Sequence, residues 1–167
     1  MVEDGSMESL TADQVWQTLD QVKDPEIPIV SVVELGIVRA VLVSGHAVII
    51  TMTPTFAGCP ALEAMKSDIV ARLRLAGAKS IDIRTVLAPP WTSDWITDAA
   101  REKLRAFGLA PPPRHEGNWE RLLSDGAACP CCGSHTTTLK NSFGPTLCRA
   151  LYYCNNCQQP FEQFKPI

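Results

Sequence analysis

Four cysteines in two pairs constrain the fold of this chain more than any other feature of its sequence. One pair lies in Cys129-Pro130-Cys131-Cys132-Gly133 and the other in Cys154-Asn155-Asn156-Cys157. Two residues inside each pair let both sulfurs face one ion, and the 21 residues between the pairs suffice for a β-hairpin that brings them together. The sequence therefore predicts one metal ion in a small β ribbon, with the ligands Cys129, Cys132, Cys154 and Cys157.

We expect this metal to be structural zinc, because four protein ligands close the coordination shell and so short a segment has little core of its own. Iron is the alternative, since a tetrahedral sulfur site accepts both metals. The remaining ribbon cysteines, Cys131 and Cys148, are expected to be spectators.

Composition limits the partners and the location. The chain has seven cysteines and opens with an acidic, polar segment unlike a secretion signal, which predicts a cytoplasmic protein whose cysteines bind metal. It contains no apolar run of about 18 residues, so no membrane span is expected. The net charge is −3, and the ribbon holds only Lys140, Arg149 and Lys165 as basic residues. A nucleic-acid partner is therefore not expected.

A length of 167 residues fits one domain of ordinary size with a small appendage. We predict that residues 1–9 are disordered or a tag remnant and that residues 10–109 form the main domain. Residues 110–125 form a proline-rich linker, and residues 126–167 form the four-cysteine ribbon.

Hydrophobic periodicity predicts the order α-β-β-α-β-α for the main domain. The expected helices and strands cover residues 11–24, 38–43, 48–53, 60–76, 80–87 and 93–107. Ser44-Gly45 is the expected tight turn of a hairpin, and the following strand-helix-strand unit implies a parallel pair. The fold class is therefore α+β: a small mixed three-stranded sheet with packed helices, followed by a C-terminal β zinc ribbon.

The helix ends carry more detailed signals. Thr11 and Gln14 form a capping box at the start of the first helix, and Asp24-Pro25 is expected to end it. Thr92 or Ser93 is the expected cap of the third helix, whose apolar stripe includes Phe107.

Cys59 lies between the second strand and the second helix and is followed by Pro60. Because proline suits the first helical position, Cys59 falls at or beside the N-cap, where free N–H groups favour the thiolate and lower the pKa. Thr53 and Thr55 can donate hydrogen bonds to a bound sulfur or anion. Cys59 is thus a candidate soft-metal ligand or nucleophile, and a small buried cysteine is an equally good interpretation.

Asp24-Pro25-Glu26 has two interpretations. It can hold a carboxylate near Cys59, or it can be a turn with solvated acids. The residues alone favour the turn.

Three longer motifs resemble those of the MIP18 family of iron–sulfur assembly proteins, also called DUF59. They are residues 24–30 (DPEIPIV), residues 34–38 (ELGIV) and Thr51-x-Thr53 with the later Cys59-Pro60. Residues 54–61, residues 88–96 and the ribbon narrow the resemblance to family members that act in phenylacetate degradation.

The resemblance implies a maturation or targeting factor, not an enzyme, that handles iron or an iron–sulfur cluster transiently. The implied client is the 2Fe–2S reductase component of the phenylacetyl-CoA epoxidase, or the assembled epoxidase complex. In the family the cysteine matching Cys59 is the functional thiol and the acid matching Asp24 lies near it. With them, Thr53, Thr55 and Glu26 are the expected contacts to a cluster or a client thiol.

One thiolate cannot hold a cluster tightly, because clusters take four ligands. A lone cysteine per protomer therefore suits transient binding, shared across a homodimer or with the client. Two alternatives stay open: a zinc-ribbon adaptor for another protein without cluster chemistry, and an enzyme that uses Cys59 as a nucleophile beside a base.

Overall fold

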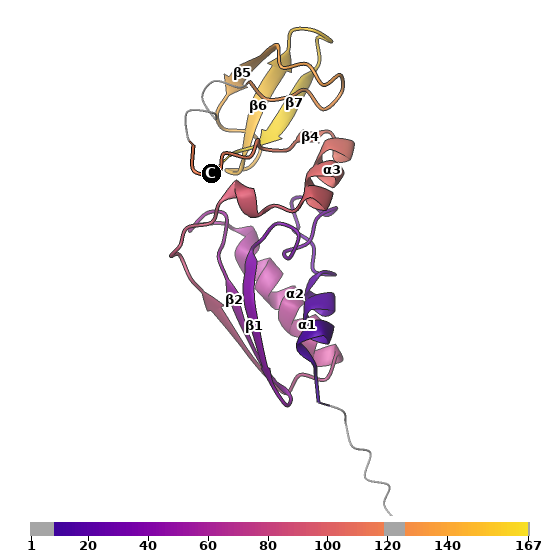
Figure 1. Cartoon of the computed structure of the whole chain (residues 1–167), viewed down its shortest axis with the longest axis vertical. Helices are drawn as coiled ribbons and strands as arrows, with labels where there is room; N and C mark the ends of the chain where they lie inside the picture. Colours follow the sequence, from indigo (N-terminus) through magenta and orange to yellow (C-terminus); the bar gives the residue numbers. More distant parts are fainter. Residues whose placement is uncertain (1–8, 119–125, 167) are drawn as a thin grey trace, which may run out of the picture.

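The computed structural model describes residues 9–118 and 126–166, and it shows an elongated molecule made of two bodies (Figure 1). A helix-and-sheet body carries the N-terminal part, and a β ribbon sits at its other end. The predictions for residues 1–8 and 119–125 lie outside the described residues. Within the described ranges, none of the helices is long and apolar enough to cross a membrane.

The sheet of the main body has the predicted mixed topology. Strands β1 (Val38–Ser44) and β2 (Ala47–Met52) form an antiparallel hairpin, and β3 (Ser80–Thr85) pairs with β2 in parallel. The strand order is β1-β2-β3. The α+β fold class predicted from the sequence is confirmed.

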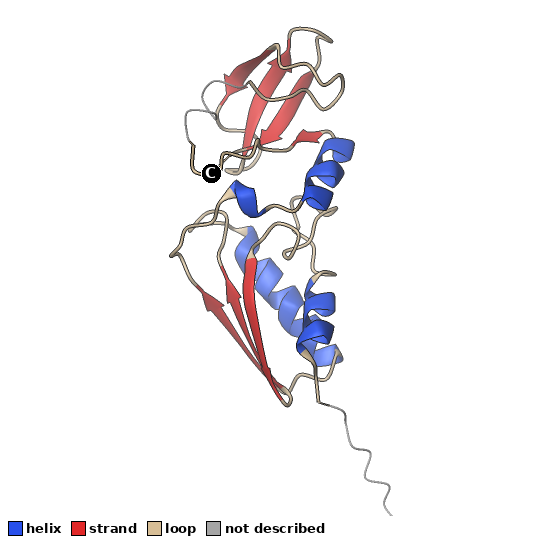
Figure 2. Ribbon diagram, viewed as in Figure 1, coloured by secondary structure: helices blue, strands red, loops and turns tan. Residues whose placement is uncertain are grey.

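Two helices, α1 (Ala12–Leu19) and α2 (Ala61–Leu75), lie on one face of this sheet (Figure 2). The predicted capping box opens α1, since the Thr11 hydroxyl accepts from the Gln14 backbone N–H at 3.2 Å and the Gln14 side chain accepts from the Thr11 N–H at 2.9 Å.

The first helix ends earlier than predicted. It stops at Leu19, because the chain beyond it pairs with the segment that follows the turn. Val32 N–H donates to the Val22 carbonyl at 3.0 Å, and Asp24 N–H donates to the Val30 carbonyl at 3.1 Å. These bonds need extended backbone, so they replace the last helical turn and fix both ends of the loop at residues 24–30.

The third helix is also shifted from its prediction. Thr92 caps only a 3-10 turn, η1 (Ser93–Trp95), whereas α3 (Asp98–Phe107) is capped by the Thr97 hydroxyl, which accepts from Ala100 N–H at 3.1 Å. The predicted caps, Thr92 or Ser93, were therefore wrong for the α-helix. Phe107 was wrongly placed in the buried stripe, because its side chain is 51% exposed.

The ribbon is a four-stranded sheet in the order β4-β7-β6-β5. Its strands are β4 (Leu109–Ala110), β5 (Thr137–Asn141), β6 (Arg149–Cys154) and β7 (Pro160–Phe164). The short β4 directly follows α3, yet it pairs in parallel with β7 near the C-terminus. The chain that leaves the main body therefore supplies an edge strand to the ribbon.

An aromatic contact anchors the ribbon in the main core. Phe164, at the end of β7, is only 1% exposed and belongs to the same buried cluster as the helices and sheet of the main body. Its ring centroid lies 5.8 Å from that of Trp91, whose indole N–H donates to the Leu35 carbonyl at 3.0 Å. The two bodies thus share one hydrophobic core at their junction.

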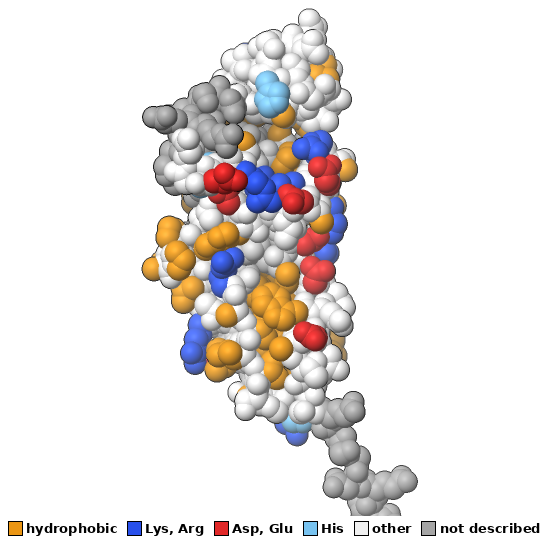
Figure 3. Space-filling view, viewed as in Figure 1, with side chains coloured by type: hydrophobic (Ala, Val, Ile, Leu, Met, Phe, Trp, Pro, Cys, Tyr) orange, Lys and Arg blue, Asp and Glu red, His pale blue; other side chains and the backbone are white. Residues whose placement is uncertain are grey.

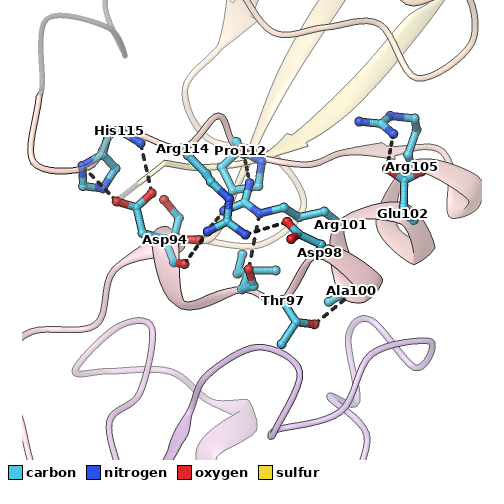
Figure 4. Close-up of polar contacts among 12 residues, drawn as sticks. Asp94, Thr97, Asp98, Ala100, Arg101, Glu102, Arg105, Pro112, Arg114 and His115 are labelled. Atoms are coloured by element: carbon cyan, nitrogen blue, oxygen red, sulfur yellow. Dashed lines mark hydrogen bonds and ion pairs between the residues drawn. The ribbon is translucent and has the colours of Figure 1, made fainter.

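Polar contacts fasten the start of the predicted linker across the same junction (Figure 4). The buried Arg101 guanidinium donates to the carbonyls of Ser93, at 2.6 Å, and of Pro112. The Asp94 carboxylate accepts from His115 N–H at 3.0 Å, and Arg114 forms an ion pair with Asp98. Figure 3 shows acidic and basic side chains gathered in a band over this region. Residues 110–115 are therefore held against the main body.

Candidate functional site

The four predicted ribbon ligands converge on one point. The Sγ atoms of Cys129, Cys132, Cys154 and Cys157 all lie within 4.8 Å of one another. Two of the separations, Cys129 to Cys157 and Cys132 to Cys154, are 3.6 Å. Thiolates about 2.3 Å from a tetrahedral zinc ion stand about 3.8 Å apart, so the sulfur set fits such an ion.

Backbone and side-chain donors surround these sulfurs. The N–H of Cys157 donates to the Cys154 sulfur at 3.5 Å, and the Asn156 amide donates to the Cys132 sulfur at 3.6 Å. A hydrogen bond from the Ser134 backbone, followed by that of Asn156, lowers the pKa of Cys132 to about 6. Burial raises the pKa of Cys129 and raises that of Cys157 to about 12, so the pKa values of the ligands are shifted in opposite directions.

A second site, which we call the interbody pocket, lies where the ribbon meets the main body. Its volume is about 240 Å³. The main body contributes Asp24, Glu26, Thr55, Phe56, Cys59 and Pro60, and the ribbon contributes Phe143, Gly144, Pro145, Thr146, Leu147, Cys148 and Phe164. Segments far apart in the sequence thus form opposite walls of one pocket.

Four of the five predicted contact residues line this pocket. Asp24, Glu26, Thr55 and Cys59 meet there, whereas Thr53 is buried, donates its N–H to the Ile37 carbonyl at 2.8 Å, and is not part of the lining. The roles of these residues stay predictions, but Asp24 and Glu26 share the pocket with the thiol, and the resemblance had implied this proximity for Asp24.

The loop at residues 24–30, which we call the acidic loop, has a fixed backbone. The Asp24 carboxylate accepts from the N–H groups of Glu26, at 2.7 Å, and Ile27, at 3.1 Å, and so closes a tight turn. From the ribbon, the Arg149 guanidinium donates to the Glu26 carbonyl at 2.6 Å and pairs with Glu162 at 2.9 Å. The ribbon therefore holds the loop that carries both pocket carboxylates.

The helix position of Cys59 is close to the prediction. Pro60 is the N-cap of α2 instead of its first residue, so Cys59 directly precedes the cap. Its N–H donates to the Phe56 carbonyl and its carbonyl accepts from Leu62 N–H, both at 3.2 Å. These bonds fix the backbone that presents the half-buried thiol to the pocket.

The expectation of a lowered pKa for Cys59 was wrong. Burial raises the pKa of this thiol, and the charges of Asp24 and Glu26 raise it further. The backbone N–H groups of Ala61 and Leu62 act in the opposite direction but do not compensate. The pKa expectation rested on the helix start alone and left out the burial of the thiol and the charges of the nearby carboxylates.

Cys148 is the pocket residue that the sequence did not point to. It was expected to be a spectator, yet its half-buried side chain lines the interbody pocket, with its sulfur 3.1 Å from the Thr146 hydroxyl. Burial, followed by the charges of Glu26 and Asp24, raises its pKa as well. The only signal in the sequence was that a cysteine remained outside the ribbon metal site.

None of the three histidines lines this pocket. The ring of His46 lies 3.2 Å from the Gly77 carbonyl, that of His115 lies 3.0 Å from the Thr92 hydroxyl, and that of His135 lies 3.2 Å from the Gly126 carbonyl. The interbody pocket therefore lacks the imidazole base that a cysteine hydrolase uses.

Comparison with known proteins identifies the class. Residues 12–84 match the family described as iron–sulfur cluster assembly protein, and residues 115–165 match the family described as PaaD zinc beta ribbon domain. The chain belongs to the MIP18, or DUF59, family of iron–sulfur assembly proteins. Within it the chain is PaaD-like: it is 41% identical over 154 residues, 92% of each chain, to a protein of Escherichia coli that is named as a putative 1,2-phenylacetyl-CoA epoxidase subunit.

Other relatives correspond to the main body alone. The Fe-S protein maturation auxiliary factor of Porphyromonas gingivalis is 32% identical and covers 56% of this chain and 90% of its own length. The maturation auxiliary factor YitW of Bacillus subtilis is 33% identical, with 57% and 94% covered. A solved DUF59 domain from Bacillus anthracis is 30% identical, with a TM-score of 0.52 over 55% of this chain and 89% of its own. The helix-and-sheet body thus occurs without a ribbon.

Loss of one ribbon ligand should unfold the ribbon and leave the main body folded. We expect Cys132→Ser to release the ribbon metal and unfold β5 to β7, because the ribbon has little core without it. The main body should stay folded but lose stability by about 3–5 kcal/mol, the cost of removing a buried phenylalanine, because Phe164 would leave the core. Metal analysis and amide hydrogen exchange measure both effects.

Cys131→Ser, at an exposed neighbouring cysteine, is the matched control. Full protection of β5 to β7 without metal would contradict the prediction.

The pocket electrostatics predict the titration of Cys59. In the metal-loaded protein, we expect its alkylation rate to show a midpoint above the free-thiol value of about 8.5, because burial and two carboxylates favour the protonated thiol. Asp24→Asn should lower the midpoint by removing one negative charge, whereas Glu102→Gln, on α3, should not change it. Peptide mass spectrometry assigns the alkylated cysteine. A wild-type midpoint below about 8, or equal midpoints in wild type and Asp24→Asn, would overturn this account.

Proposed function

We propose that this protein is a maturation and targeting factor that carries iron or an iron–sulfur cluster transiently at Cys59. The observation that supports this most is the interbody pocket, where the half-buried Cys59 thiol lies with the Asp24 and Glu26 side chains. A thiol beside negative charge favours a bound cation, because the metal offsets the charge that otherwise keeps the thiol protonated. The relatives named as Fe-S protein maturation auxiliary factors support the same role.

The proposed client is the 2Fe–2S reductase component of the phenylacetyl-CoA epoxidase, or the assembled epoxidase complex. The 41% identity to a protein whose name places it in that epoxidase system supports this client. The proposed location is the cytoplasm, because its reducing conditions keep cysteines free to bind metal. The ribbon would contribute a docking surface, because Phe143 and Leu147 are 65% and 52% exposed at the rim of the pocket. We also propose zinc as the ribbon metal, with a structural role.

An enzyme that uses Cys59 as its nucleophile is the less favoured alternative. A volume of about 240 Å³ lies below the range of about 300–1,000 Å³ that is typical of pockets for small organic substrates. No histidine faces the thiol, and its pKa is raised, so it is a poor nucleophile at neutral pH. Both properties suit an ion or a small cluster better than a coenzyme A thioester.

Co-expression with the epoxidase proteins tests the proposed function. We expect the reductase to accumulate without this protein but to carry less iron and sulfide per chain, because cluster delivery is lost while synthesis is not. Cys59→Ala should fold normally, behave like the deletion and fail to support growth on phenylacetate. Cys131→Ala should behave like wild type. Equal cluster content with and without the protein, under iron-limited and oxygen-exposed conditions, would rule out the maturation role and favour an adaptor.

A further inference from the structure

We propose that Cys148 is a second thiol ligand for the iron or 2Fe–2S cluster held at Cys59, so that the ribbon and the main body each supply one thiolate to the cargo. This inference rests on the proposed function and adds a residue to the same site. It starts from placement: Cys148 lies in the wall that the ribbon presents to the interbody pocket, and its side chain is half-buried there, as is that of Cys59.

The backbone at Cys148 is held from several directions. Its carbonyl accepts from Lys165 N–H at 2.8 Å, in the chain that follows β7. Its neighbour Arg149 donates to the Glu26 carbonyl at 2.6 Å, and so ties this position to the acidic loop. The turn that contains Cys148 is closed by the bond from Gly144 N–H to the Arg149 carbonyl at 2.8 Å. These bonds fix the backbone of Cys148, so its thiol is held at the pocket in a defined position.

Glycine at position 144 suits the close packing of this turn. A Cβ atom added there would lie 3.1 Å from both the Cβ and the carbonyl oxygen of Arg149. The close approach lets the turn fold back beside Cys148 and keeps Phe143, Pro145 and Thr146 in the pocket wall.

The two thiols share one electrostatic environment. Burial raises the pKa of both Cys59 and Cys148, and the charges of Asp24 and Glu26 raise both further, so both sulfurs lie within the field of the same carboxylates. Both shifts favour the protonated form of the thiol. A ferrous ion supplies the positive charge that lets both lose a proton, and binding at one thiol favours ionisation of the other.

Two thiolates from one protein also fit the cargo. In a 2Fe–2S cluster with four cysteine ligands, each iron takes two of them. Cys59 and Cys148 can fill the positions of one iron and leave the other iron for the client. Among the described residues, only the four ribbon cysteines form a group of three or more His, Cys, Asp or Glu side chains whose ligand atoms lie within 4.8 Å of one another. The interbody pocket therefore does not offer a full set of four ligands. Such a site holds the cargo without trapping it.

Loading and release are ligand exchanges without electron transfer. As each Fe–S bond forms, the thiol gives its proton to solvent and one weaker ligand, such as water, leaves the iron. On release, a cysteine thiolate of the client replaces Cys148 or Cys59 on the iron, and the departing thiolate takes up a proton. The carboxylates of Asp24 and Glu26 favour that last protonation.

The test uses the full-length, zinc-loaded protein under anaerobic conditions, titrated with ferrous iron alone and, separately, with ferrous iron plus sulfide. We expect Cys148→Ser to weaken iron binding at least about tenfold, since even an indirect metal contact typically contributes about 10–100-fold in affinity. Cluster formation should fall to a similar extent. Cys131→Ser should match wild type, because its side chain is exposed and outside the pocket. Zinc content and circular dichroism confirm that each variant is folded, and Cys148→Ala serves as a second variant.

The outcomes separate this inference from the proposed function. If Cys59→Ser loses iron but Cys148→Ser and Cys148→Ala bind like wild type, the second ligand is overturned and the proposed function stands. If wild type binds neither iron nor cluster, both fail. A second measurement is independent of iron: phenylarsine oxide should bind one equivalent in wild type, forming two As–S bonds with loss of water, and none in either single variant. Binding that survives Cys148→Ser would mean that the thiols are not a pair.

Discussion

The ring of Phe164 lies against that of Trp91, and this contact holds the ribbon in a fixed position on the main body. The position of Phe164 depends in turn on the four-cysteine site, because a metal held by these sulfurs would fix the ribbon strands, including β7, which carries Phe164. With Phe164 seated in the main core, Arg149 reaches the Glu26 carbonyl and the segment at residues 143–148 covers the Cys59 loop. A metal in the ribbon would therefore support the interbody pocket indirectly, through the packing of Phe164.

The pocket is built to favour protonated thiols. Burial and two carboxylates raise the pKa of Cys59 and Cys148, and the start of α2 offsets this only in part. For a catalytic nucleophile this arrangement is unfavourable. For a carrier it is suitable, because a cation can bind the pocket and the thiols regain their protons when it departs. Under the proposed function, the same charges that weaken the nucleophile would favour reversible metal binding.

Local patterns in the sequence predicted local structure well. The capping box at Thr11, the hairpin of β1 and β2 and the parallel β3 follow from residues close together in the chain, and all three are present. The four ribbon ligands followed from spacing alone.

The early end of α1 could not be predicted in this way, because it results from backbone bonds between residues 22–24 and 30–32. The cap of α3 at Thr97 was missed because Thr92 offered an equally good signal five residues earlier. The pocket was missed for a larger reason: Cys148 joins Asp24 and Cys59 in one lining only because the ribbon docks on the main body, and no periodicity encodes that placement.

Iron K-edge X-ray absorption of the anaerobic, zinc-loaded protein with one equivalent of ferrous iron tests the central claim most directly, because it reports the ligands of the iron separately from those of the zinc. The account predicts two sulfur neighbours at the iron together with lighter oxygen ligands, and four sulfur neighbours at the zinc. Iron with four sulfur neighbours would show that it had entered the ribbon, and iron with none would show that the pocket thiols do not bind it. Either result would contradict a cargo site shared between the two bodies.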